Sequence, residues 1–408
     1  MNIYFADLGY LSKKDYSLAL PLNAANISSY VLKNLPNMKI KIFKDPVKLL
    51  DAVVEQKPDL LAMTHNAMNA NLTIAIAKRC KELHHQLQIV MGGPYFVKED
   101  NDWIEWFFNS REFLDLYIVG EGEVSFLKLV ELLLANDNDL NKTDITQWPS
   151  TFYGYNRDEK QLLHHANAPV EKLDLDTAPS AYLSGLLDEF LDNEYLVPNI
   201  ETNRGCPYAC AFCHWGQATH SMVRKYKLET VLEEIEYISK RSKNPTKLLM
   251  ICDANFGMFD RDIQIAEAIL DCKAKYGFPS RLYVYTLKNI LPKTMKAYEL
   301  LSSMTPMSMS LQSVNPRTLK AIGRTNIRDE HYAKIVQECK RSGIRTHCEL
   351  IYGLPEEDYA SFAQGVREVL KRGQERIQLY LHVLYWGGES ATRAYRKRYG
   401  FKTAYRYQ

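Results

Sequence analysis

Three cysteines in one short stretch are the residues of this sequence whose types and spacing most directly suggest chemistry. Cys206, Cys210 and Cys213 have three residues between the first two and two residues between the last two. A short loop with thiolates at these intervals can wrap one iron–sulfur cluster, with each sulfur ligating one iron. Three ligands leave one iron of a cubane cluster open to a substrate or cofactor. Gly205 and Pro207, which flank Cys206, favour a tight loop over a helix.

The same cysteines admit two other interpretations. A structural zinc site would use them together with His214 or His220, although zinc sites usually pair two Cys-x-x-Cys units at a distance. A disulfide framework fits less well, because the other five of the eight cysteines are scattered and no signal peptide precedes them. The cysteine usage therefore predicts a reducing, cytoplasmic environment.

The composition of the 408-residue chain is that of an ordinary globular protein. Hydrophobic residues make up 46% and charged residues 25%, and the length allows two or three domains with separate cores. A formal net charge of +2 gives no reason to expect nucleic acid or an anionic membrane as a partner. Because no apolar run approaches the ~20 residues that cross a bilayer, we expect no membrane-spanning segment.

The residues before the cysteines alternate between strand and helix patterns. The periodicity predicts strands at residues 2–7, 39–43, 60–63, 88–91 and 116–119, and helices at 22–35, 47–56, 71–83 and 124–134. Such β-α repeats predict a parallel sheet that is covered on both faces. Ligands of these sheets bind at the carboxyl ends of the strands, where glycine loops let a backbone come close.

The residues after the cysteines resume the alternation. Strands are predicted at 247–252, 281–286, 307–311, 345–351 and 378–384, and helices at 228–239, 262–275, 292–302, 329–342 and 361–371. With the strand before Cys206 these make six β-α units, which suit a partial parallel barrel with reactive residues at the strand carboxyl ends. Between the two halves, a hairpin of residues 151–155 and 161–165 and a helix from 179 to 191 are predicted to form a connection.

The motif Cys206-x-x-x-Cys210-x-Phe212-Cys213 resembles the signature of radical S-adenosylmethionine (SAM) enzymes. In that family the three thiolates hold a 4Fe-4S cluster, and the fourth iron chelates the amino and carboxylate groups of SAM. The resemblance implies a deoxyadenosyl radical that abstracts hydrogen from a substrate. It also places Phe212 near the adenine of SAM.

The resemblance further assigns polar residues at the strand ends to SAM. Gln312 matches a position that binds the ribose, and Glu349 matches an acidic residue that takes the ribose hydroxyls. Arg324 matches a position that pairs with the methionine carboxylate, which suits the guanidinium fork, although a surface salt bridge is its alternative role. Asp253 and Asn255 are candidates for the SAM amino group or the substrate. For Asp253, a helix cap or a backbone clamp is an equal alternative.

The first part of the chain resembles the cobalamin-binding domain that precedes many radical SAM domains. The resemblance rests on two glycine loops and on the polar loop 64–71, which is expected to face the corrin ring. The candidate cobalamin-binding residues are His65, Asn66, Gly92, Gly93, Gly120, Glu121 and Gly122. The Asp-x-His-x-x-Gly element that supplies a cobalt ligand in other cobalamin proteins is absent, so cobalt is expected to lack a lower protein ligand. A flavodoxin-like domain without a ligand is the alternative.

These observations predict an α/β protein with three parts. Residues 1–135 are expected to form a flavodoxin- or Rossmann-like cobalamin-binding domain, residues 136–195 a linker, and residues 196–408 a radical SAM core with a partial (β/α)6 barrel. The implied cofactors are a 4Fe-4S cluster, SAM and cobalamin. The implied partners are a small-molecule or peptide substrate and an electron donor such as flavodoxin or ferredoxin.

The implied function is methylation of an unactivated carbon of the substrate. One alternative is a cobalamin-dependent rearrangement, cyclisation or oxidation without methyl transfer. Another is a cofactor-binding protein without turnover, because members of the family normally continue beyond the sixth strand, whereas this chain ends at Gln408.

Overall fold

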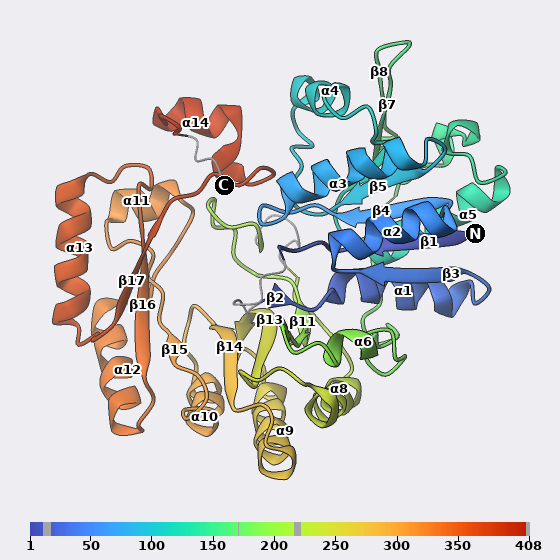
Figure 1. Ribbon diagram of the computed structural model, residues 1–408. Helices are drawn as coiled ribbons and strands as arrows, with labels where there is room; N and C mark the ends of the chain where they lie inside the picture. Colours follow the sequence, from blue (N-terminus) through green and yellow to red (C-terminus); the bar gives the residue numbers. More distant parts are fainter. Residues whose placement is uncertain (11–17, 170, 216–221, 405–408) are drawn as a thin grey trace. The chain divides into compact units, whose positions relative to one another are not determined.

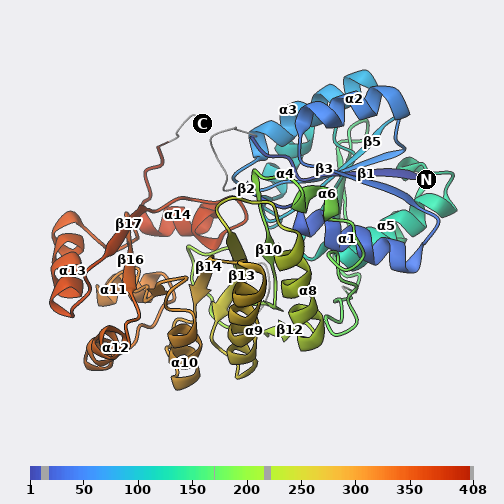
Figure 2. The same ribbon diagram turned by 60° about the horizontal axis from the view of Figure 1, so that its bottom comes forward.

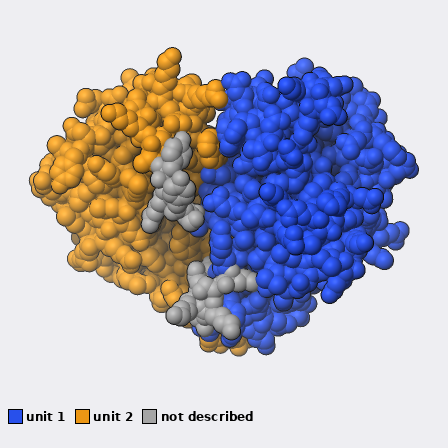
Figure 3. All heavy atoms as spheres, turned by 45° about the horizontal axis from the view of Figure 1, so that its top comes forward, with its two compact units in different colours: residues 1–198, 241–245 blue, residues 199–240, 246–408 orange. Residues whose placement is uncertain are grey.

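The computed structural model describes residues 1–10, 18–169, 171–215 and 222–404 (Figure 1). The chain divides into two compact units, which Figure 3 colours separately. Unit 1 comprises residues 1–198 and 241–245, and unit 2 comprises residues 199–240 and 246–408. The candidate cobalamin residues lie in unit 1, and the candidate cluster and SAM residues lie in unit 2. None of the helices in the described part of the chain combines the length and the apolar composition needed to cross a bilayer.

Unit 1 is built on a seven-stranded sheet with the strand order β3-β1-β4-β5-β6-β7-β8. The first five strands run parallel, whereas β7 and β8 are antiparallel to their neighbours. The strands are β1 (Asn2–Ala6), β3 (Lys39–Phe43), β4 (Leu60–Thr64), β5 (Gln88–Gly92), β6 (Leu116–Ile118), β7 (Phe152–Asn156) and β8 (Gln161–Leu163). The central strands β1, β4 and β5 are buried, which explains their unbroken apolar runs in the sequence.

Helices cover both faces of this sheet. They are α1 (Leu22–Asn34), α2 (Pro46–Gln56), α3 (Ala70–Leu83), α4 (Asn101–Asn109) and α5 (Gly122–Ala135). Helix α1 contacts α5 on one face and α2 contacts α3 on the other, as Figure 2 shows. Local sequence sets where these helices begin: the Asp45 side chain accepts a hydrogen bond from the Val47 amide at 2.8 Å, and Pro46 follows as the first residue of α2.

The segment predicted to be a linker lies within unit 1. Strand β7 pairs with β6, so the hairpin extends the sheet. The predicted helix from 179 to 191 is wrong over most of its length, since only α6 (Asp188–Leu191) is helical. Gly185 has φ +80°, a left-handed conformation that interrupts a helix. The remaining elements are η1 (Leu140–Lys142), η2 (Ile145–Gln147) and the parallel pair β2 (Leu18–Ala19) and β9 (Leu196–Val197).

Unit 2 contains two three-stranded parallel sheets. The first has the order β10-β13-β14 and the second β15-β16-β17. Their bounds are β10 (Asn199–Ile200), β13 (Leu248–Phe256), β14 (Arg281–Thr286), β15 (Met307–Ser308), β16 (Thr346–Tyr352) and β17 (Ile377–Leu381). The register of β13 shifts between Ile251 and Phe256, which makes a bulge over residues 252–255. Bulges re-aim side chains and are common beside active sites.

The helices of unit 2 follow the strands as predicted, with two additions. They are α8 (Leu228–Arg241), α9 (Arg261–Tyr276), α10 (Pro292–Leu300), α11 (Pro316–Ala321), α12 (Asp329–Arg341), α13 (Tyr359–Lys371) and α14 (Arg393–Tyr399), with the short η3 (Glu389–Ala391) before α14. Helices α11 and α14 were not predicted. The antiparallel pair β11 (Asn203–Arg204) and β12 (Arg224–Lys225) flanks the cysteine loop.

Candidate metal centre

The cysteine loop follows β11 in unit 2. Cys206 and Cys210 are buried, Cys213 is half-buried, and all three are free thiols. Gly205 has φ +120°, and a Cβ at this position would lie 2.6 Å from the carbonyl oxygen of Met222. Only glycine allows this close approach of the two backbones, so Gly205 sets where the loop begins.

Two nitrogen donors from other elements reach the cysteine sulfurs. Asn255, in the bulge of β13, is buried and donates its Nδ2 to Cys206 Sγ at 3.3 Å. The Nη1 atom of Arg324 lies 3.9 Å from Cys210 Sγ. Hydrogen bonds to sulfur orient thiolate ligands and tune the reduction potential of iron–sulfur clusters. The loop therefore has donors that suit a cluster ligated by these sulfurs.

Of the two histidines in the zinc interpretation, one lies among the described residues. Within those residues, no three His, Cys, Asp or Glu side chains, the three cysteines included, are gathered as a site for a metal ion. His214 packs its ring edge-on against Tyr385 at 5.3 Å between centroids, and burial lowers the pKa of His214. His220 lies outside the described residues.

Asp253 is fully buried and holds the chain just before the cysteine loop. Its carboxylate accepts hydrogen bonds from the Thr202 amide at 2.7 Å, the Asn203 amide at 3.2 Å and Asn203 Nδ2 at 2.7 Å, and also from the Thr202 hydroxyl. Burial raises the pKa of Asp253 to about 7, against the lowering effect of these hydrogen bonds. Because its partners all belong to the strand that leads into the loop, Asp253 has the contacts of a backbone clamp.

A chain of hydrogen bonds joins the candidate SAM residues. Arg324 donates from Nη2 to the Ser310 carbonyl oxygen and from Nε to Asn326 Oδ1 at 2.9 Å. The Ser310 hydroxyl donates to Glu349 Oε2 at 2.7 Å, and His347 Nε2 lies 3.7 Å from Glu349 Oε1. Burial acts to raise the pKa of Glu349, but the hydrogen bonds from His347 and Ser310 outweigh it, and the pKa lies below its ordinary value. Glu349 is therefore held as a carboxylate.

Gln312 occupies a strained position between β15 and β16. Its φ is +65°, which is uncommon for a residue with a side chain. Its amide donates to the Glu349 carbonyl oxygen at 2.9 Å, and its own carbonyl accepts from the Ile351 amide at 2.8 Å. Within the described residues, the buried Gln312 Oε1 has no hydrogen-bond partner. Strained backbone and an unpartnered buried acceptor are features that gather at functional sites.

Sequence reasoning missed Ser310 and His347. Both follow the two-residue alternation of a strand, since Ser310 stands two residues before Gln312 and His347 two residues before Glu349. Residues i and i+2 share one face of a strand, so this spacing was the signal that could have found them. Phe212, the candidate adenine contact, is half-buried in the cysteine loop.

In unit 1, the candidate cobalamin residues lie at the carboxyl edge of the sheet, after β4, β5 and β6. Gly93 has φ +140°, and a Cβ there would lie 2.4 Å from the His65 carbonyl oxygen. A Cβ at Gly122 would lie 2.5 Å from Ile27 Cδ1, on α1. Gly120 has φ +81°, and its Cβ position has no atom of the described residues within 4 Å. Gly93 and Gly122 therefore allow close packing that a side chain would prevent, whereas the space beside Gly120 is not filled by the described residues.

The other candidates at this edge are more exposed than the sheet below them. Asn66 accepts a hydrogen bond from the Met68 amide at 2.8 Å, Gly92 is the last residue of β5, and Glu121 precedes α5 as its N-cap residue. Below them, Asp7 accepts from Thr64 Oγ1 at 2.6 Å. These contacts fix the ends of β1 and β4 relative to one another.

The imidazole of His65 is buried, whereas loop 64–71 was expected to face a ligand. The residue is 1% exposed, its Nδ1 lies 3.2 Å from the Tyr117 hydroxyl, and its ring packs edge-on against Tyr95 and Phe107. Burial, together with the charge of Arg111, lowers the pKa of His65 to about 4. The side chain packs in the aromatic core of unit 1, and its buried Nε2 has no hydrogen-bond partner among the described residues.

Replacing His65 with phenylalanine is expected to remove an acid sensitivity of unit 1. The pKa of His65 is about 4 in the folded state, against ~6.5 in the unfolded chain, so the stability contributed by the neutral ring is full above pH ~6.5 and falls as the pH drops toward 4. Between pH ~7 and ~5 the free energy of unfolding of the wild type is expected to fall by about 2 kcal/mol through this residue. Urea unfolding at both pH values measures it, with the exposed His85→Gln as control. An equal pH dependence in wild type and His65→Phe would contradict this expectation.

Comparison with known proteins adds family information. Residues 200–369 match the family described as the Radical SAM superfamily. Over 385 residues the chain is 34% identical to the 2-(S-pantetheinyl)-carbapenam-3-carboxylate methyltransferase of Streptantibioticus cattleyicolor, covering 88% of this chain and 53% of that protein. Over 378 residues it is 32% identical to the cobalamin-dependent radical SAM methyltransferase TokK of Streptomyces tokunonensis, with the same coverage of 88% and 53%. The chain thus spans about half the length of these relatives.

A solved structure shares the fold. The radical S-adenosylmethionine methyltransferase TsrM from Kitasatospora setae, with cobalamin and a [4Fe-4S] cluster bound, superimposes with a TM-score of 0.71 and 15% identity. The match covers 98% of this chain and 79% of TsrM. The chain therefore shares its fold with TsrM over both units.

Proposed function

We propose that this chain, which belongs to the radical SAM superfamily, is a cobalamin-dependent methyltransferase that acts on an unactivated carbon of a small-molecule or peptide substrate. The observation that carries the proposal is the cysteine loop, where the Asn255 amide meets Cys206 Sγ and the Arg324 guanidinium lies beside Cys210 Sγ. The names of the two relatives support the reaction type. We place the protein in the cytoplasm, where thiols stay reduced.

In this proposal Cys206, Cys210 and Cys213 hold a 4Fe-4S cluster and leave one iron open for SAM. Arg324 lies next to this loop and suits the carboxylate of SAM, since a guanidinium binds a carboxylate through two parallel hydrogen bonds. The free Oε1 of Gln312 and the carboxylate of Glu349 suit the ribose hydroxyls. We assign Phe212 to the adenine and give Asn255 a role at the cluster sulfur, with Asp253 as the clamp of the loop.

Cobalamin is proposed to bind unit 1, mainly through residues 1–135. The order β3-β1-β4-β5-β6 is that of flavodoxin-like folds, whose ligands sit where the strand order reverses, here at the carboxyl ends of β1 and β4. The backbones of Gly92 and Gly93, Asn66, and the loop from Gly120 to Gly122 would line that edge. Because the His65 ring is buried, the proposal gives cobalt no histidine ligand from this loop.

Residues 196–408 are proposed to form the radical SAM core, with the six parallel strands of unit 2 as a partial barrel. When bound, the cluster supplies the electron that opens the sulfonium of SAM, and cobalamin supplies the methyl group. The task of this chain's own residues is to hold SAM against the open iron and to keep its carboxylate and ribose in one orientation. An electron donor of the flavodoxin or ferredoxin class is required.

The direct test is product analysis with SAM that carries a deuterated methyl group. The reconstituted protein is incubated with reductant, cobalamin and the compound in the name of the first relative, the pantetheinyl carbapenam carboxylate. Label in the recovered compound supports methyl transfer. Deoxyadenosine without label in any product would favour a rearrangement, cyclisation or oxidation instead. SAM recovered intact from protein with a full cluster would overturn the proposal.

Arg324→Lys is expected to weaken SAM binding about tenfold, because lysine offers a point charge in place of the guanidinium fork. Iron content should stay unchanged, since the cysteines keep their places. Equilibrium binding of SAM to the reconstituted protein measures the change. Arg317→Lys, on the neighbouring helix α11, is the matched control and should bind SAM like wild type. Equal affinities for Arg324→Lys and wild type would remove Arg324 from the SAM site.

A further inference from the structure

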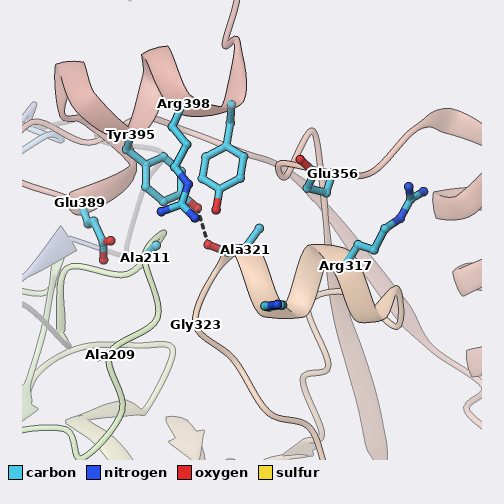
Figure 4. Close-up of a pocket in the computed structure, with 11 residues that line it drawn as sticks. Ala209, Ala211, Arg317, Ala321, Gly323, Glu356, Glu389, Tyr395 and Arg398 are labelled. Atoms are coloured by element: carbon cyan, nitrogen blue, oxygen red, sulfur yellow. Dashed lines mark hydrogen bonds between the residues drawn. The ribbon is translucent and has the colours of Figure 1, made fainter.

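Unit 2 has a cavity of about 610 Å³ against the outer side of the cysteine loop (Figure 4). Two of its walls are Ala209 and Ala211, which flank Cys210 in the sequence. The other walls come from α11, from the turn that follows it, and from α14. The cavity therefore reaches the chain on both sides of one candidate cluster ligand.

Hydrogen bonds tie these walls to the cysteine loop. The Ala211 amide donates to the Ile322 carbonyl oxygen at 3.0 Å, and the Ala211 carbonyl accepts from the Ser390 amide at 3.0 Å. On α14, the Tyr395 hydroxyl donates to the Ala321 carbonyl oxygen at 2.9 Å, the bond drawn in Figure 4. The walls of the cavity are thus joined by hydrogen bonds to Ala211, the residue that follows Cys210.

The rim of the cavity is rich in positive charge. Arg317 and Lys320 from α11 and Arg398 from α14 line it, against two carboxylates, Glu356 and Glu389. Helix α14 adds three more cations and no acid; they are Arg393, Arg396 and Lys397. Since the whole chain has a formal charge of only +2, this is a local concentration of charge.

Two of these cations, Lys320 and Arg398, have no carboxylate partner among the described residues. None of the ion pairs in the part of the chain that the structure describes takes up Lys320 or Arg398. Both residues are exposed. Their charges are therefore available to a partner that approaches the cavity.

We propose that this cavity and α14 form the docking surface for an acidic one-electron carrier protein of the flavodoxin type. The inference rests on the proposed function. The reduced carrier would give one electron to the cluster. The carrier is thereby oxidised by one electron and the cluster reduced by one electron, and no bond is made or broken and no proton is transferred. Complementary charge steers such an encounter and raises its rate.

The placement of the cations favours a protein over a small anion. They are spread over two helices, and Figure 4 shows Arg398 extending over the cavity toward Ala321 while Arg317 extends away from it. A site for a single phosphate or carboxylate brings its donors together on one point. A spread of charges around an opening is instead what a broad, acidic protein surface matches.

The test compares two double variants with the same change in charge. Lys320→Glu/Arg398→Glu alters the docking surface. Arg341→Glu/Lys371→Glu alters exposed residues in the last turns of α12 and α13, which lead into β16 and β17 and so lie at the amino ends of these strands, opposite the cavity. The cluster-loaded proteins are mixed with reduced flavodoxin, and flavodoxin oxidation is followed by stopped-flow absorbance. Calorimetry gives the affinity for flavodoxin.

We expect the docking variant to react with flavodoxin about tenfold more slowly at low ionic strength and to lose most of its salt dependence. The control variant should react like wild type. Reduction by the methyl viologen radical, a small cation that needs no docking surface, should be no slower in the docking variant than in the other two proteins, because added negative charge attracts a cation.

Equal flavodoxin rates and affinities in the two variants would overturn the inference. An equally large decrease in the rate of reduction by methyl viologen would overturn it too, because the substitutions would then act on the cluster itself. Failure of methyl viologen to reduce wild type would instead count against the proposed function. The two failures are therefore distinguishable.

Discussion

Replacing Cys206, Cys210 and Cys213 together with alanine is expected to lower the iron and sulfide content of the reconstituted protein by at least about tenfold, and to abolish SAM cleavage. These three thiols come from one loop. The sulfur of Cys206 accepts a hydrogen bond from Asn255, and the sulfur of Cys210 lies beside the guanidinium of Arg324. Without these thiols, the described residues offer no other group of three His, Cys, Asp or Glu ligands. Iron and sulfide assays and the absorbance of the anaerobic protein measure the loss.

A triple variant of other thiols serves as the matched control. Cys80, Cys272 and Cys339 are buried and stand outside the loop. Changing all three to alanine should reduce stability, because small buried side chains are lost from the core, while the iron content stays at the wild-type level. Iron retained by the loop variant, or zinc bound in place of iron in wild type, would contradict the cluster assignment.

Asp253→Asn is expected to lower the free energy of unfolding by about 3 kcal/mol and to reduce cluster loading. The buried carboxylate accepts hydrogen bonds from Thr202 and Asn203, and the amide nitrogen of asparagine would face the Asn203 Nδ2 donor. The strand that leads into the cysteine loop would then lose its anchor. Chemical unfolding and iron content after reconstitution measure the two effects.

The control for this change is Asp262→Asn. Asp262 is also fully buried and accepts from the Gly257 and Phe259 amides at 2.9 and 3.0 Å, but it does not contact the cysteine strand. Its substitution should cost stability and leave cluster loading intact. Equal loss of iron in both variants would show that general destabilisation, and not the clamp, controls the loop.

Much of the site could be predicted because its residues are local in sequence or stand at strand ends. The spacing of Cys206, Cys210 and Cys213 needs no tertiary information, and parallel strands deliver their carboxyl ends to one edge. Gln312 and Glu349 were assigned from the resemblance to radical SAM enzymes, and the structure brings their backbones into hydrogen-bond contact at 2.9 Å.

The rest depends on contacts that periodicity does not encode. The strand predicted to end at residue 252 continues to Phe256 through a bulge, and this bulge places Asp253 on Thr202 and Asn255 on Cys206. The buried residues of this bulge are the polar Asp253 and Asn255, so the apolar alternation that predicted the strand stops at residue 252.

The burial of the His65 ring was not predicted for a similar reason. A histidine in a polar loop reads as exposed, yet the aromatic side chains that bury it come from Tyr95, Phe107 and Tyr117, which are distant in sequence. Helix α14 and its cavity were also missed, since a short basic segment near the chain end reads as a solvated surface until its contact with the cysteine loop is seen.

The measurement that tests the central claim most directly is the electron paramagnetic resonance spectrum of the reduced, reconstituted protein with SAM that carries isotopic labels in its amino and carboxylate groups. Three protein thiolates on a four-iron cluster predict hyperfine couplings from both labelled groups, because SAM would ligate the open iron. A spectrum that is identical with and without SAM, from protein whose iron and sulfide content is complete, would contradict this account.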